Sequence, residues 1–394
     1  MEPDDGSVDC HDRPTAGSVF LCATLFCERH SNEWTGRKMT NKNGLVVDTD
    51  IHPGVNADRV RARLPEPWRT RYASGNRGSG NLGWWNPMGV ERSDVELEDG
   101  RTIHGDPKLL EEHFLDKYAI DYGVLLPGGV LHTAQSPEPD FAAAVISAVN
   151  DVYAEEWLPQ SPRLLSSLGV YPHLPEMAVA EIHRLGGHPQ FVQVQLPSAS
   201  RIPWGQRIFH PIYEAASEYG LAVAIHPGSE GVGLSGPPNA AGYPTSYFEW
   251  HTTLVNSYIA HVTSMLAEGV FARFPDLKFV LVEGGISWLP PILWRMDKNW
   301  KALHSTVPWL NELPSEVAAR HIRVTTQPLE EPPDADHFHA MLEMFPAERM
   351  LMFSSDFPHW DGDAPDFALR QFPEHLRSRI MGQTAAELYG LEAV

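Results

Sequence analysis

Candidate metal ligands stand at the end of an apolar segment that begins near Leu45, where the sequence starts to alternate between short apolar segments and helical stretches. This segment ends Val46-Val47-Asp48-Thr49-Asp50-Ile51-His52. Alternate residues of a strand point to the same face, so Asp48, Asp50 and His52 are predicted to share one. A strand that simply turns polar where it meets a loop is the plainer interpretation. Two carboxylates and an imidazole on one face are, however, side chains that bind divalent metal ions.

Three further apolar segments end in the same kinds of residue. His226 follows Ala-Val-Ala-Ile, Glu283 follows Val-Leu-Val, and Asp356 follows Phe-Ser-Ser. A single histidine in this position is more often an ordinary core or surface residue, but a glutamate is costly to bury unless it is paired or binds a metal. Four such segments together predict one metal site. Its expected ligands are Asp50, His52, His226, Glu283 and Asp356.

Other residues near these segments extend the predicted site. His251 could complete the shell of a second metal ion, although a plain histidine at the start of a helix is the alternative. Aromatic side chains beside the ligands are candidate walls of an apolar substrate pocket. The tryptophans assigned to this pocket are Trp250, Trp288 and Trp360. Trp288 also stands at helical spacing from Trp294 and Trp300, and the alternative interpretation is that it packs in the core.

The elements that must position these residues alternate between short apolar segments and helical stretches. From Leu45 onward this pattern is typical of parallel strands joined by helices. Eight strand–helix units in one chain favour a closed (β/α)8 barrel, in which the carboxyl ends of the strands carry the site. The expected strands are Leu45–Thr49, Tyr122–Leu126, Leu164–Gly169, Phe191–Gln195, Leu221–Ile225, Phe279–Val282, Ile322–Thr325 and Met350–Ser354.

Two long insertions and a leader segment complete the predicted organisation. The insertions, Gly54–Tyr118 after the first strand and Pro227–Trp250 after the fifth, leave the functional end of the barrel, and residues 54–118 are expected to form a cap. Residues 39–394 are predicted to form one domain. Residues 1–38 are expected to be a dispensable leader, and they hold all three cysteines. A zinc knuckle built from Cys10, His11, Cys22 and Cys27 is the alternative for this segment.

The ligand pattern resembles the amidohydrolase superfamily, in the branch that includes aminocarboxymuconate-semialdehyde decarboxylase. That branch has Asp-x-His-x-His at strand one, histidines at strands five and six, and aspartate at strand eight. The resemblance extends from about Leu45 to the C-terminus and implies metal binding by His52, His226 and Asp356. Asp50 and Glu283 stand where the family has histidine. The resulting oxygen-rich set suits one or two ions of iron, zinc or manganese.

The predicted reaction is hydrolysis of an ester, thioester, amide or lactone in a largely apolar small molecule. A metal-bound water would attack the carbonyl, and Asp356 would accept its proton. Glu283, the second expected catalytic residue, would either bridge two ions or act as a protonated general acid. The alternatives are a non-oxidative decarboxylase or hydratase, and a dinuclear iron or manganese oxygenase. A binding protein with a decayed site fits less well, because every expected ligand position is polar.

The charge and the apolar content of the sequence limit which partners the protein can bind. The chain has 394 residues and a formal net charge of −21, with 51 acidic against 30 basic residues, so it would repel nucleic acid. The apolar run Val19–Cys27 is too short to span a membrane, and the acidic residues before it do not suit a secretory signal. We therefore expect a cytoplasmic enzyme, assembled as a homodimer, with a small-molecule substrate and no membrane partner.

Overall fold

The computed structural model describes residues 44–73 and 91–392, which belong to one compact unit. The expected leader, residues 1–38 with Cys10, Cys22 and Cys27, lies outside the described residues. Part of the expected cap, residues 74–90, also lies outside them. Among the described residues, no helix is both long enough and apolar enough to cross a membrane.

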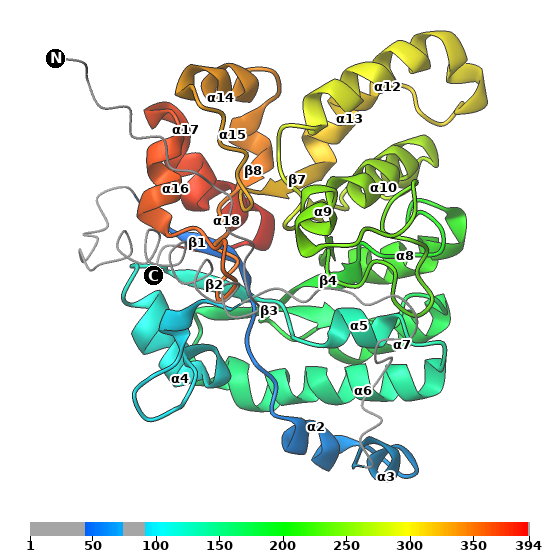
Figure 1. Ribbon diagram of the computed structural model, residues 1–394. Coiled ribbons are helices and arrows are strands. Elements are labelled where there is room, and N and C mark those ends of the chain that lie inside the picture. The colour runs from blue at the N-terminus through cyan, green and yellow to red at the C-terminus, as the bar shows by residue number, and fades with distance from the viewer. Residues whose placement is uncertain (1–43, 74–90, 393–394) are drawn as a thin grey trace, which may run out of the picture. The chain divides into compact units, whose positions relative to one another are not determined.

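Eight parallel strands pair in chain order and close into a barrel (Figure 1). After β8 the chain returns to β1, where Thr49 N donates to Phe353 O at 3.0 Å and His52 N donates to Phe357 O at 2.7 Å. These bonds join the two ends of the sheet and confirm the predicted (β/α)8 barrel. The strands are β1 (Val47–Ile51), β2 (Tyr122–Leu125), β3 (Leu164–Gly169), β4 (Phe191–Pro197), β5 (Ala222–His226), β6 (Phe279–Leu281), β7 (Ile322–Thr325) and β8 (Leu351–Met352).

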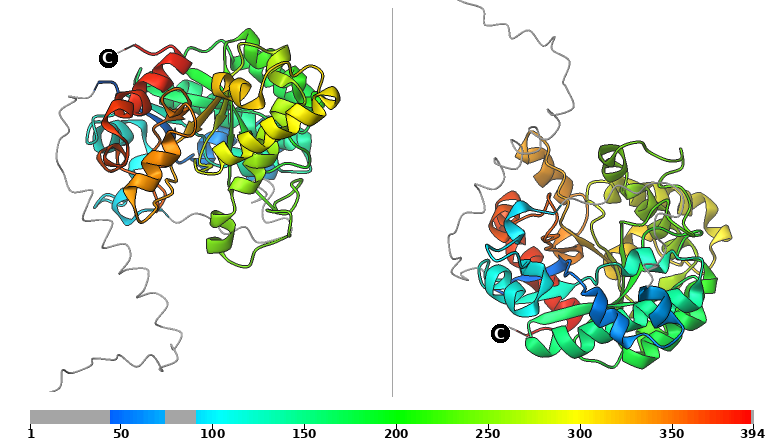
Figure 2. Two further views of the ribbon diagram at one scale, coloured as in Figure 1. Left: turned by 90° about the horizontal axis from the view of Figure 1, so that it is seen from above. Right: turned by 60° about the horizontal axis from the view of Figure 1, so that its bottom comes forward.

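Helices between the strands surround the barrel (Figures 1 and 2). Proline in the first turn starts α6, α7, α8, α12 and α13, because its fixed φ suits a helix and its missing N–H costs nothing there. The barrel helices are α5 (Val130–Ala134), α6 (Pro139–Val152), α7 (Pro175–Leu185), α8 (His210–Glu218), α10 (Val255–Ala267), α11 (Val270–Arg273), α12 (Leu289–Leu303), α13 (Pro314–His321), α14 (Ala335–Leu342), α15 (Ala347–Met350), α16 (Pro365–Gln371), α17 (Glu374–Ser378) and α18 (Thr384–Tyr389).

The two predicted insertions contribute short helices of their own. The first contains α2 (Ala57–Arg63), α3 (Trp68–Ala73) and α4 (Pro107–Leu110). The second ends in α9 (Tyr247–Thr252), which starts with a capping box: Ser246 and Glu249 each bond the other's backbone N–H. This cap fixes where the second insertion stops and places α9 after β5.

A buried histidine on α10 makes stability sensitive to acid. His261 Nε2 donates to Ser198 O at 2.7 Å, and its Nδ1 accepts from Trp204 N at 3.1 Å, so the neutral ring is fully bonded. Burial lowers the pKa of His261 to about 4. Because this value lies below the unfolded one, the stability it contributes is complete above about pH 6.5 and is lost as the pH falls toward 4.

We expect the melting temperature of the wild type to fall between about pH 6.5 and pH 4.5. His261→Gln should start from a lower melting temperature at neutral pH, because it loses part of this bonding, and should then fall less. Thermal unfolding followed by circular dichroism at several pH values measures both slopes. Equal slopes in the two proteins would show that His261 does not control this transition.

Candidate metal centre

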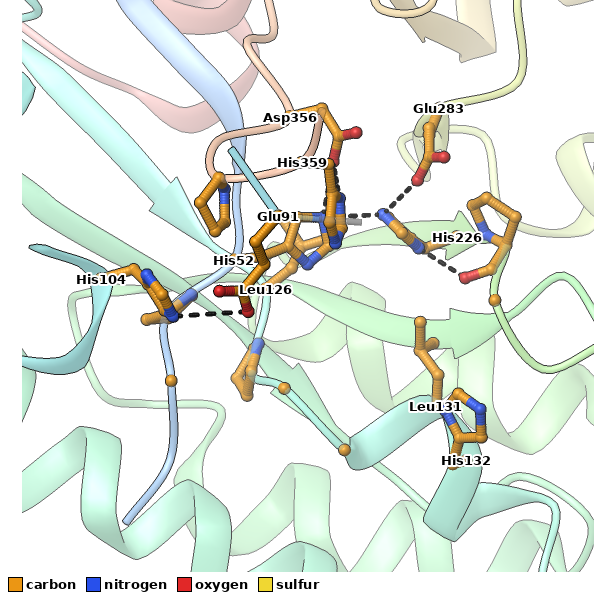
Figure 3. A pocket seen from close by; sticks show the side chains of 18 of the residues that line it. His52, Glu91, His104, Leu126, Leu131, His132, His226, Glu283, Asp356 and His359 are labelled. Atoms are coloured by element: carbon orange, nitrogen blue, oxygen red, sulfur yellow. Dashed lines mark hydrogen bonds and ion pairs between the residues drawn. The ribbon is translucent and has the colours of Figure 1, made fainter. Parts of the chain in front are cut away.

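The structure brings the five predicted ligands together at the carboxyl end of the barrel. Asp50 lies in β1, His52 directly follows it, His226 ends β5, and Glu283 and Asp356 follow β6 and β8. Each offers one ligand atom, and these atoms lie within 4.8 Å of one another. Figure 3 shows the two histidines meeting beneath the two carboxylates that follow β6 and β8.

The two imidazoles face each other through their Nε2 atoms, which are 3.1 Å apart. The Nδ1 atom of His226 lies 2.7 Å from Pro227 O and donates to it, so the neutral ring has its lone pair at Nε2. His52 Nε2 lies 3.0 Å from Asp50 Oδ1 and 3.1 Å from Asp356 Oδ1. Glu283 Oε2 lies 3.1 Å from His226 Nε2. Nitrogen and oxygen donors therefore converge on one point.

Three carboxylate oxygens of this cluster are buried without a hydrogen bond. Among the described residues, neither oxygen of Asp50 nor Oδ2 of Asp356 has a hydrogen-bond partner. Both residues are almost completely buried, at 0% and 1% exposure. Buried carboxylate oxygens that accept no hydrogen bond are costly, and a coordinated cation removes the cost. The residues present thus fit a divalent metal ion, with Asp50, His52, His226, Glu283 and Asp356 as its ligands.

The electrostatics of the cluster also favour an added positive charge. Burial opposes the charged form of His226, but the carboxylates of Asp50 and Glu283 raise its pKa well above the usual range. The pKa of Glu283 is raised by burial and by the negative charge of Asp356. The protein without metal therefore gains protons to balance three neighbouring carboxylates, and a divalent ion would balance the same charge.

Two of the ligands have a backbone conformation that side chains rarely adopt. Glu283 has φ of 58° and Asp356 has φ of 56°. Such left-handed residues cost roughly 1–3 kcal/mol and persist where the surroundings enforce them. Here Glu283 N donates to Thr325 Oγ1 at 3.0 Å, and Asp356 N donates to Asp50 O at 3.1 Å. The barrel bends the chain after β6 and β8 so that both carboxylates enter the cluster.

Two further residues support the proposed ligands: His359, which was not predicted as a site residue, and Asp48, which was predicted to share a strand face with Asp50 and His52. His359 Nδ1 lies 2.6 Å from Asp356 Oδ1. Burial lowers the pKa of His359, but Asp356 more than offsets this effect and raises the pKa to about 10. Asp48 Oδ1 accepts from Asp50 N at 3.2 Å and from Ser355 N at 2.9 Å, and burial raises the pKa of Asp48 to about 7. The Asp-x-x-His spacing after β8 is the sequence signal for His359.

A cavity of about 290 Å³ opens beside the cluster (Figure 3). Its apolar wall includes Leu126, Leu131, Pro227 and Trp250. Its polar lining outside the cluster includes Glu91, His104, His132, Gln195 and Asp361. No lysine or arginine among the described residues lines this cavity. The cavity therefore has the volume and the mixed lining expected for a small, partly apolar ligand.

Two of the three tryptophans predicted for the substrate pocket lie outside the cavity lining. Trp288 and Trp360, although described, are not part of the cavity lining. The Trp288 indole N–H donates to Gly284 O at 2.8 Å at the start of α12, and the Trp360 indole N–H donates to the Tyr247 hydroxyl at 3.2 Å. These bonds hold the two indole rings at positions outside the cavity lining. Of the three predicted tryptophans, only Trp250 lines it.

His251 lies in α9, outside the group of five ligands. Its Nε2 atom is 3.3 Å from Asp361 Oδ2 and 3.9 Å from Glu283 Oε1. The ring therefore sits behind Glu283 and does not line the cavity. This position makes it a neighbour of the five proposed ligands, and the described residues form no second group that could hold a metal ion around it.

Comparisons with known proteins agree with this fold. Solved structures similar to the chain include an amidohydrolase of Mycobacterium avium subsp. paratuberculosis K-10 (19% identity, TM-score 0.67, covering 88% of this chain and 100% of that one). Another is a dihydroxybenzoic acid decarboxylase of Polaromonas sp. JS666 with bound manganese and 2-nitroresorcinol (16%, 0.62, 89% and 98%). A third is a 5-carboxyvanillate decarboxylase of Novosphingobium aromaticivorans DSM 12444 with bound manganese (18%, 0.62, 90% and 98%).

At these identities the solved structures establish the fold, and the family is established by sequence. The amidohydrolase family model matches residues 41–391, which span the whole barrel and all five residues of the cluster. The resemblance that the ligand pattern indicated is therefore confirmed. The chain belongs to the amidohydrolase family.

Proposed function

We propose that this protein is a metal-dependent, non-oxidative decarboxylase that acts on a hydroxylated aromatic acid. The observation that carries the proposal is the position of His359, which lines the cavity while its Nδ1 lies 2.6 Å from Asp356 Oδ1. Oδ1 of Asp356 is engaged by His359 and lies 3.1 Å from His52 Nε2, so an imidazole that can donate a proton stands between this oxygen and the cavity. Decarboxylation needs a proton donor at this point, whereas hydrolysis needs a free base.

The similar structures support this alternative to hydrolysis. The Polaromonas and Novosphingobium proteins are decarboxylases of aromatic acids, and both were solved with manganese. We take a single manganese ion as the cofactor, because the five donors converge on one centre and His251 lies outside them. When bound, the ion would hold the substrate carboxylate and withdraw electron density from it.

The chain's own residues would carry the rest of the reaction. His359 would deliver a proton through Nε2 to the ring carbon that bears the carboxylate, since its Nδ1 is engaged by Asp356. The carbon–carbon bond to the carboxylate then breaks, its electron pair restores the aromatic ring, and carbon dioxide leaves. A proton from solvent returns to His359. Leu126, Leu131 and Trp250 would hold the ring and keep water from the reacting carbon.

Removing and restoring the metal tests the proposal. The protein is stripped with a chelator, reloaded with manganese, zinc or iron, and offered 2,6-dihydroxybenzoate, 5-carboxyvanillate, a p-nitrophenyl ester and a lactone. We expect the manganese-loaded protein to release one carbon dioxide for each phenolic product, and the stripped protein to lose at least about 99% of that rate. Metal-dependent hydrolysis of the ester or lactone without carbon dioxide release would instead support hydrolysis.

A further inference from the structure

Two glutamines of β4 lie two residues apart, on one face of the strand, and differ in their bonding. Gln193 and Gln195 are both buried, at 0% and 1% exposure. The Gln193 amide N–H donates to Ser167 Oγ at 2.9 Å, and its Oε1 accepts from the Tyr389 hydroxyl at 2.8 Å. The Oε1 atom of Gln195 is buried without a hydrogen-bond partner among the described residues. One glutamine therefore completes the barrel core, and the other has bonding capacity to spare.

Gln195 borders the substrate cavity beside the metal cluster. It is part of the cavity lining, together with His226 of the neighbouring strand. In the β4–β5 register Gln195 pairs with Ala224 and Pro197 pairs with His226, so the glutamine lies two residue pairs below this proposed metal ligand. A substrate bound at the cluster would then have its substituents next to the metal-bound group within reach of this carboxamide.

The chemistry of the unpaired oxygen limits what can bind there. A carbonyl oxygen can only accept a hydrogen bond, and a carboxylate of the substrate has no hydrogen to give. Leaving such a group buried and unpaired is costly, so a bound donor that reaches it gains affinity. We propose that Gln195 binds a hydroxyl group of the substrate, carried on the ring carbon next to the one that bears the carboxylate. This inference rests on the proposed function, because it assumes an aromatic acid bound through its carboxylate.

A substrate with a hydroxyl on each side of the carboxylate allows the contact with the metal to be distinguished from the contact with Gln195. One hydroxyl can bind the metal together with the acid group, and the second would meet Gln195. A substrate analogue with one hydroxyl can keep the metal contact but not both contacts together. Selectivity for the second hydroxyl is therefore the property that Gln195 should control, and neither metal binding nor correct folding alone produces it.

Two unreactive probes measure this selectivity without turnover. In 2-nitroresorcinol a nitro group stands in place of the carboxylate, between two hydroxyls, and 2-nitrophenol lacks one of those hydroxyls. We expect the manganese-loaded wild type to bind 2-nitroresorcinol about tenfold more tightly than 2-nitrophenol by isothermal titration calorimetry. In Gln195→Met and Gln195→Ala the ratio of the two affinities should fall to about two, with the manganese content unchanged. A factor of about two remains because the symmetric diol can bind in two equivalent orientations and 2-nitrophenol in only one.

The control is Gln193→Leu on the same strand. It should lower the melting temperature, because Ser167 and Tyr389 lose their partner, and it should keep the tenfold ratio. A ratio that stays near ten in both Gln195 variants would overturn the proposal, as would a wild type that binds the two probes equally or binds neither. Carbon dioxide release is measured separately, so a protein that shows the Gln195-dependent ratio but never decarboxylates would refute the proposed reaction alone.

Discussion

The His226→Ala variant is expected to lose nearly all bound metal, and its rate of carbon dioxide release should fall at least about 1,000-fold as a result. His226 is 3% exposed, and its Nε2 lies within 3.1 Å of both His52 Nε2 and Glu283 Oε2, so it is central to the cluster. Its bond to Pro227 O presents the Nε2 lone pair to the metal. Alanine removes this donor from the cluster.

Metal content per chain, measured by mass spectrometry after dialysis, and the rate with 2,6-dihydroxybenzoate are the two readouts. The matched control is His183→Ala, which changes an exposed histidine of α7 away from the cluster. It should keep both metal and rate. A His226→Ala protein that folds and retains a full complement of metal would show that the five residues are not the ligand set.

Much of this centre could be predicted because it depends on local periodicity. Asp50 and His52 alternate along the first strand, and the residues at the carboxyl ends of β5, β6 and β8 must come together at one end of a closed parallel barrel. The first strand itself is displaced, since Val47–Ile51 is observed where Leu45–Thr49 was expected. Backbone hydrogen bonds from Thr49 and His52 to the chain after β8 extend the first strand at its carboxyl end. Because these partners lie about 300 residues away in the sequence, no local pattern predicts them.

The walls of the cavity were harder to predict, because they depend on how distant loops pack. Nothing in the spacing of Trp288 or Trp360 shows that their indole N–H groups bind Gly284 O and the Tyr247 hydroxyl. The left-handed backbone at Glu283 and Asp356 likewise comes from the closed barrel and not from the residue types, which usually avoid it. In both cases tertiary contacts override local preference.

Gln195 illustrates a signal that was present in the sequence. The strand reads Phe-Val-Gln-Val-Gln-Leu-Pro, and two glutamines in an apolar strand must each satisfy an amide inside the protein. The pattern predicts two buried amides on one face. Only the structure shows that Tyr389 and Ser167 satisfy the first of them and that the second faces the cavity.

Glu283→Gln is expected to move stability and metal affinity in opposite directions. In the wild type without metal, burial and the charge of Asp356 raise the pKa of Glu283, so its ionised form destabilises the fold. Glutamine keeps the shape without the charge, and we expect it to stabilise the metal-free protein by about 1–2 kcal/mol at neutral pH. With manganese present the order should reverse, because the missing carboxylate weakens metal binding by at least about 100-fold.

The pH dependence of this variant follows from the direction of the shift. A carboxyl group whose folded pKa is raised stabilises the fold below its unfolded pKa, and this contribution is lost as the pH rises through the folded value. The stability advantage of Glu283→Gln in the metal-free protein should therefore be greatest at neutral and alkaline pH and vanish near about pH 4.

Melting temperatures measured across this pH range, with chelator and with manganese, give both comparisons. Glu176→Gln, a change at an exposed position of α7, should alter neither. If metal-free Glu283→Gln melts below the metal-free wild type at every pH, Glu283 is stabilised by its neighbours as an anion, and its place in the cluster is structural without needing a metal ion.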